Sequence, residues 1–213
     1  MKDRWIILAV IMLLTAPSFG SDWTLEAFLG GAWNIPSSLT VLQRGYPDVS
    51  LKARYDEKTF EGFPYYDLRI SRWSNNRAWE LELVHHKIYL SNPSPEIDKF
   101  SISDGFNIIS VNHAWNVKKI ILRLGAGAVL THPESTIRGM AFDESRGMFN
   151  QGYYFSGAAL QAALGKHLFL WKGLFASFEG KVTAAFVQVP IAGGHADVTN
   201  VAFHILVGLG YRI

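Results

Sequence analysis

The last fourteen residues, Asn-Val-Ala-Phe-His-Ile-Leu-Val-Gly-Leu-Gly-Tyr-Arg-Ile at 200–213, decide how the rest of the chain is interpreted. Every second position from Phe203 to Ile213 is apolar or aromatic, whereas the positions between them are mostly small or polar, among them His204 and Arg212. A period of two over this length predicts a β-strand with one apolar face. A strand that stays apolar to the carboxyl end of the chain is typical of a membrane-spanning β-strand.

The amino end predicts export from the cytoplasm. Lys2 and Arg4 precede an apolar run from Trp5 to Ala16, and small residues follow up to Gly20. This order is that of a secretory signal peptide, 1–20, which leaves one mature domain, 21–213. The alternative is an N-terminal membrane anchor, for which the apolar run is short, since a spanning helix needs about 20 residues.

The composition fits a small barrel in a membrane. Charged residues are 18% and aromatic residues 14% of the chain, with 19 glycines and a formal net charge of +2. Such a barrel needs an apolar exterior with aromatic girdles, and glycine where the interior is crowded. The near-balanced charge does not indicate nucleic-acid binding. The absence of cysteine excludes disulfides and a lipoprotein anchor.

Alternation of apolar and polar residues recurs along the mature chain, so we predict an all-β fold, an eight-stranded antiparallel up-and-down transmembrane β-barrel. The eight expected strands are 23–34, 65–73, 78–90, 101–115, 119–131, 153–164, 174–187 and 200–213. Tight turns, including one at 165–167, alternate with long connections, as in outer-membrane barrels. The longest polar connection, 132–152, is expected on the outer surface.

Two segments leave alternatives. The β-prone region 37–56 is interpreted as a ribbon that extends the first hairpin beyond the membrane, although two further spanning strands would give ten. In 78–90, strict alternation would point His85 and Lys87 at lipid, where a charge near the midplane costs about 2–4 kcal/mol. We therefore expect a bulge near Val84 that turns His85 and Lys87 inward and His86 outward.

The strand pattern and the ending Val207–Arg212 resemble the small eight-stranded bacterial outer-membrane β-barrels, the group that includes the transmembrane domain of outer membrane protein A. The terminal residue is Ile213 rather than the usual Phe or Trp. The resemblance implies the outer membrane of a Gram-negative bacterium, contacts with outer-membrane lipids and lipopolysaccharide, assembly by the barrel-assembly machinery through the C-terminal strand, and a monomer. The group holds structural proteins, adhesins, small pores and lipid A-modifying enzymes, so it does not fix the function.

Charged residues at inward positions are the most informative set. Those expected inside are Glu26, Asp67, Arg69, Glu80, Glu82, His85, Lys87, Arg123, Glu179, Lys181, His204 and Arg212. Side chains just fill an eight-stranded barrel, and charges persist there when paired. We predict a plugged interior and a structural or surface-interaction protein without catalysis; a narrow pore is the alternative that uses the same residues.

Two further functions were weighed against this one. The lipid A deacylase barrels carry a lipid-facing His and Ser two residues apart, and no His here precedes a Ser at that spacing; Ser91 lies five residues after His86. A lipid A-modifying hydrolase is therefore an alternative function that lacks the His and Ser spacing of the known enzymes. A soluble lipocalin-type barrel that binds a small apolar ligand is a further alternative. We expect no metal or cofactor, because His195 and Asp197 supply only two ligands on one face.

Overall fold

The computed structural model describes residues 21–59, 62, 64–148 and 150–213. The expected signal peptide lies outside these residues and stays a prediction. Within them there is no helix long and apolar enough to cross a membrane. The described strands are β1 (Ser21–Ile35), β2 (Ser37–Gln43), β3 (Val49–Ala53), β4 (Tyr55–Asp56), β5 (Tyr66–Ser74), β6 (Arg77–Leu90), β7 (Ile97–Val117), β8 (Ile120–Ile137), β9 (Met140–Ala141), β10 (Tyr154–Trp171), β11 (Leu174–Ile191) and β12 (Gly194–Arg212).

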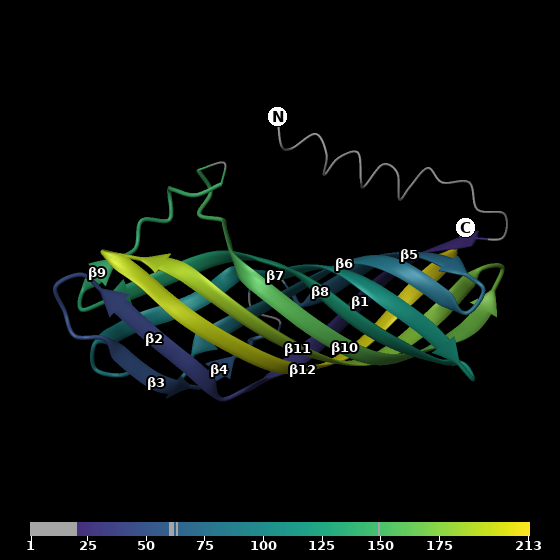
Figure 1. Cartoon of the computed structure of the whole chain (residues 1–213), viewed down its shortest axis with the longest axis horizontal. Helices are drawn as coiled ribbons and strands as arrows, with labels where there is room; N and C mark the ends of the chain where they lie inside the picture. The colour runs from purple at the N-terminus through teal and green to yellow at the C-terminus, as the bar shows by residue number, and fades with distance from the viewer. Residues whose placement is uncertain (1–20, 60–61, 63, 149) are drawn as a thin grey trace.

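Eight of these strands form a closed antiparallel ring. Its order is β1-β5-β6-β7-β8-β10-β11-β12, and β12 pairs again with β1, from Thr24 opposite Arg212 to Ile35 opposite Val201. The first and last strands, β1 in purple and β12 in yellow in Figure 1, therefore lie side by side in the barrel wall. The prediction of an eight-stranded antiparallel barrel is confirmed.

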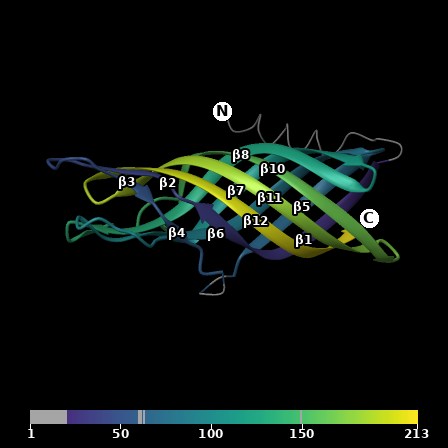
Figure 2. The ribbon, with the colours of Figure 1, turned by 90° about the horizontal axis from the view of Figure 1, so that it is seen from below.

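The two ends of the barrel differ. Two-residue turns at 75–76, 118–119 and 172–173 lie at one end, which we call the turn end, together with Ser21 and Ile213. The opposite, loop end carries β2, β3 and β9, which project past the ring (Figures 1 and 2). Short turns at one end and long connections at the other are the arrangement of outer-membrane barrels.

The region 37–56 adds no strand to the ring. β2 pairs with the loop-end part of β12 and forms a hairpin with β3, while β4 pairs with β6. Pro36, which lacks an amide hydrogen, separates β1 from β2. The segment therefore extends the barrel wall beyond the ring, and the alternative of ten spanning strands is wrong.

Several strands are longer than the sequence indicates. β10 continues through the predicted turn at 165–167 and turns only at Lys172–Gly173. Gly165 is therefore part of the barrel wall and not of a turn. A Cβ at this position would lie 2.7 Å from Nη1 of Arg123, so glycine is needed here to make room for the guanidinium. The predicted loop 132–152 likewise begins as strand, since β8 runs to Ile137.

The distribution of polar and apolar side chains between the inner and outer faces of the wall reverses along the barrel axis. On β12, Ile205 and Val207 are exposed outward while His204 is buried inward; nearer the loop end, Asp197 is exposed and Val198 is buried. β11 shows the same exchange within 178–189. We call the part with an apolar exterior, 174–186 and 201–212 on these two strands, the turn half, and the part beyond it the loop half.

Candidate functional site in the barrel interior

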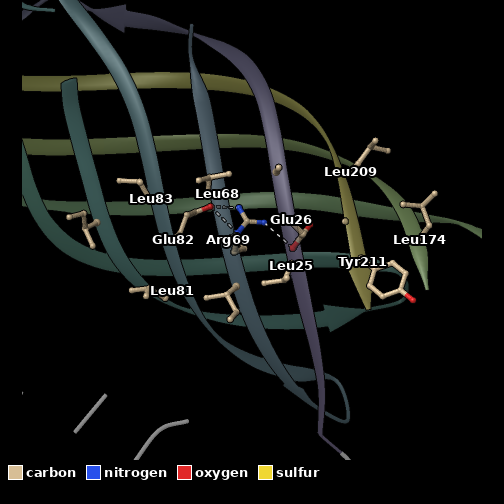
Figure 3. A pocket seen from close by; sticks show the side chains of 14 residues that line it. Leu25, Glu26, Leu68, Arg69, Leu81, Glu82, Leu83, Leu174, Leu209 and Tyr211 are labelled. Carbon is tan, nitrogen blue, oxygen red and sulfur yellow. Dashed lines mark hydrogen bonds and ion pairs between the residues drawn. The ribbon is translucent and has the colours of Figure 1, made fainter. Parts of the chain in front are cut away.

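Arg69 occupies the centre of the turn-half interior. It lies on β5 directly opposite Glu82 of β6, and its Nε donates to Oε1 of Glu82 at 2.8 Å. Its Nη2 donates to Oε1 of Glu179, across the barrel on β11, at 2.7 Å, and its Nη1 lies 3.6 Å from Oε2 of Glu26. Figure 3 shows the guanidinium held between Glu82 and Glu26. One planar cation thus ties together three parts of the barrel wall.

Arg123 and Lys181 bind the remaining carboxylates. Nε of Arg123, on β8, donates to Oε2 of Glu80 at 3.0 Å, and its Nη1 donates to Oε2 of Glu179 at 2.9 Å. Nζ of Lys181 donates to Oε1 of Glu82 at 2.8 Å and also to the carboxylate of Asp67. Each acidic group in this region therefore faces at least one cation, which a buried charge requires.

These eight residues form what we call the charged network: Glu26, Asp67, Arg69, Glu80, Glu82, Arg123, Glu179 and Lys181. All eight are buried. The three cations are fewer than the five carboxylates, and neutral donors satisfy further oxygens: Ser177 donates to Glu26 at 2.7 Å and Asn112 to Glu82 at 2.8 Å. The network crosses the lumen, and its charged side chains are hydrogen-bonded to one another.

A layer of aromatic and imidazole rings lies next to the network, toward the loop end. Nδ1 of His204 is 3.1 Å from the Tyr65 hydroxyl, and Nε2 is 2.9 Å from the Thr183 hydroxyl. The ring of His86 meets that of His204 edge-on at 5.5 Å and that of Phe106 at 4.9 Å. All five side chains are buried. We call them the histidine layer; beyond it the interior is mainly apolar.

Nine of the twelve charged residues expected inside lie in these two groups: the eight of the charged network and His204. His85 does not. The β6–β7 pairing jumps from His86 opposite Phe106 to Ile88 opposite Ile102, so the bulge lies on β7, at 103–105, and not in β6 near Val84 as expected. His86 rather than His85 points into the barrel. His85 lies on the opposite face, stacked on Tyr66 at 4.7 Å. The predicted orientations of His85 and His86 are therefore wrong, because β6 keeps its alternation and buries Val84, His86 and Ile88 on one face.

The other two residues meet different surroundings. Lys87 is buried and its Nζ donates to the backbone carbonyl of Lys58 at 2.9 Å, away from the charged network. Arg212 is exposed at the turn end, with Nε 3.9 Å from the carboxylate of Asp22 and its guanidinium over the ring of Phe169. Arg212 lies opposite the buried Thr24, on the inward side of β12, but at the rim of the barrel its side chain is exposed, so it does not join the buried interior as expected.

The sequence also missed a group of possible metal ligands at the loop end. Asp104, His132 and Glu134 each bring one ligand atom within 4.8 Å of the others. They come from β7 and β8, and no local motif joins them. Oε2 of Glu134 already accepts from Lys99 at 2.6 Å, a hydrogen bond that raises the pKa of Lys99. Glu134 is thus already engaged with a cation of the protein itself.

Comparison with known proteins supports the architecture. The chain matches no family model and no curated protein. The solid-state NMR structure of outer membrane protein AlkL in DMPC lipid bilayers aligns with a TM-score of 0.53 and 12% identity over 93% of each chain. The fold is that of a small outer-membrane β-barrel.

Two further structures align with this barrel at lower scores. Neisserial surface protein A gives a TM-score of 0.44 at 9% identity, over 93% of this chain and 100% of its own. Ail, the attachment invasion locus protein of Yersinia pestis, gives 0.40 at 12% identity, over 92% and 100%. At such identities a shared fold carries no information on activity.

Proposed function

We propose that this chain is an integral outer-membrane protein of a Gram-negative bacterium, structural or surface-interacting in kind, with a plugged interior and no catalytic activity. The observation that supports it best is the exchange of polarity along the barrel. In the turn half most of the large apolar side chains point outward, and Leu29, Leu160 and Phe186 are each at least 60% exposed. Soluble monomers rarely expose contiguous apolar surface of this extent, whereas a lipid-facing wall requires it.

The charged network supports a closed lumen. Arg69, Arg123 and Lys181 are each within 3.0 Å of a carboxylate oxygen, and the histidine layer and an apolar cluster follow above them. An ion entering this path would have to break buried ion pairs, which costs several kcal/mol for each charge left unpaired. A passive pore is therefore disfavoured.

Conductance across planar lipid bilayers tests this part. The purified full chain should insert without steady ion current. The variant Arg69→Ala/Arg123→Ala, which removes both guanidiniums from the lumen, should admit more current than wild type if it folds. A large, steady current through the wild-type protein contradicts the plugged interior and favours the narrow pore.

The absence of catalysis is argued from the histidines. A hydroxyl nucleophile needs a base within hydrogen-bond reach and access for the substrate. The Tyr65 and Thr183 hydroxyls do reach His204, but all three groups are buried in the interior. Mass spectra of lipid A from cells with and without the protein should be identical. A loss of acyl chains that depends on the protein would instead establish the hydrolase alternative.

The loop end is the surface proposed for external contacts. Asp143 and Arg146 pair at 3.2 Å in the connection that follows β9, and both are exposed. Hydrogen bonds from the Ser145 hydroxyl and amide lower the pKa of Asp143, so this carboxylate stays ionised to a lower pH than an ordinary aspartate. We further propose lipopolysaccharide as the neighbour of this end, a monomeric state, and assembly by the barrel-assembly machinery through β12.

A further inference from the structure

Two hollows adjoin on the outer wall of the turn half. The first, at the turn end, has a volume of about 480 Å³. We call it the polar hollow because most of its lining residues have polar side chains, among them Arg72, Asn75, Asn76, Arg77 and His113, next to Trp79. The second, about 660 Å³, is lined on the outside by the apolar side chains of Leu25, Ala27, Ile70, Leu81 and Leu83. Figure 3 shows the leucines that line this groove, on the same strands as Glu26, Arg69 and Glu82 of the charged network.

The hollows are continuous along two strands. Arg72 of β5 is directly opposite Trp79 of β6 in the polar hollow, and Ile70 is directly opposite Leu81 in the apolar groove. All four side chains point outward. The two pairs are two residues apart along each strand, which is a distance of about 7 Å. A molecule with a polar end and an apolar end therefore finds both environments in sequence on one wall.

The polar hollow has the chemistry of a phosphate site. It offers two guanidiniums and two asparagine amides, and guanidinium pairs with phosphate through charge-assisted, bidentate hydrogen bonds. Nδ1 of His113 is buried without a hydrogen-bond partner among the described residues. The His113 ring lies between Trp79, at 4.7 Å, and Trp115, at 4.5 Å. Tryptophans of this kind mark the membrane–water interface, where lipid headgroups lie.

We propose that these hollows bind one anionic phospholipid of the periplasmic leaflet, its phosphate in the polar hollow and an acyl chain in the apolar groove. The proposal rests on the membrane placement given above. A soluble phosphate ester would use only the polar hollow, whereas the apolar groove directly beside it has almost no polar surface for such a ligand. The match of positive charge at the interface with a negative headgroup is what selects this occupant.

The test uses the detergent-purified full chain, mixed with dioleoylphosphatidylglycerol or dioleoylphosphatidylcholine, and counts bound lipid by native mass spectrometry. Wild type should retain one phosphatidylglycerol more tightly than phosphatidylcholine. Arg72→Gln/Arg77→Gln should weaken that binding about 30-fold, since each surface cation contributes about 1 kcal/mol toward an anionic lipid. The matched control, Lys118→Gln/Lys119→Gln, removes two charges from the neighbouring turn at the same end and should change it less than about threefold. Equal losses in both pairs would reduce the site to general surface charge and overturn the proposal.

A second variant tests the groove separately. Ala27→Trp fills the groove from an outward, exposed position and should lower phosphatidylglycerol retention at least about tenfold. It should leave any binding of glycerol 3-phosphate, the probe without acyl chains, unchanged. Tight binding of glycerol 3-phosphate by wild type would show a soluble anion site and contradict a lipid site. Extraction of the protein into buffer without detergent would instead contradict the proposed membrane function itself.

Discussion

The turn half and the loop half of this barrel are built from the same strands but filled in opposite ways. In the turn half the interior holds the charged network and the exterior is apolar. In the loop half the interior is a cluster that includes Leu39, Ile102 and Val189, each fully buried, while Thr40 and Gln188 face outward. The loop half has the apolar interior and polar exterior of a water-soluble β-protein. The turn half has the opposite distribution, with a charged interior and an apolar exterior.

The difference shows that the surroundings, not the strand geometry, decide which residues a β-wall can hold. In water, apolar side chains gain free energy by moving inside. In lipid, an outward leucine is already in an apolar medium, so the interior is available for polar groups. Those groups then need partners, because a charge left alone in the barrel is desolvated on every side. The level at which the polarity exchanges is where we place the outer surface of the membrane.

The largest expected effect comes from breaking the charged network. Arg69→Leu leaves Glu82, Glu179 and Glu26 without their shared cation. We expect a loss of about 3–5 kcal/mol in the free energy of unfolding, as for removal of one partner from a buried ion pair. Urea titration of the protein folded in lipid vesicles, followed by gel migration of the folded form, measures it. Arg146→Leu, in the exposed connection, should change stability by less than about 0.5 kcal/mol; similar losses in both variants would contradict the structural role of the network.

A charge placed on the outer wall tests the exchange of polarity directly. Ile205 and Asp197 lie on the same face of β12, one in each half. Ile205→Arg should lower the free energy of unfolding by about 2–4 kcal/mol because the guanidinium meets hydrocarbon. Asp197→Arg should cost less than about 0.5 kcal/mol, since that position faces water. The same vesicle titration compares them, and equal costs would remove the boundary between the two halves.

The smallest effect concerns how closely the interior is packed. A Cβ at Gly165 would lie 2.7 Å from Nη1 of Arg123, whereas one at Gly180 would come no nearer than 3.8 Å to Phe203. We expect Gly165→Ala to destabilise the barrel by about 1–3 kcal/mol through overpacking and Gly180→Ala to be nearly neutral. Thermal unfolding in detergent distinguishes them. A neutral Gly165→Ala would mean that the network can shift to accept a methyl group.

The sequence predicted the turn half well because lipid leaves no freedom there. Every outward position between Leu25 and Leu29, or between Ile205 and Leu209, must be apolar, so the inward residues stand out as the complementary set. Eight members of the charged network and His204 could be found in this way. The loop half was harder to interpret: its outward side chains turn polar while the inward ones turn apolar, so a steady pattern becomes a mixed one. Parts of β8, β11 and β12 consequently lie outside the strands that the sequence predicts.

The sequence by itself determined the strand period and the sign of the charges that face inward, because alternation against lipid is a local property of each strand. Only the tertiary structure decided that 37–56 stays outside the ring of eight, which carboxylate meets which cation, that the bulge lies on β7, and that His86 rather than His85 joins the interior. It also placed Arg72 and His113 on either side of Trp79 on the outer wall. These arrangements depend on the register between strands that are distant in the chain, and no single strand contains that information.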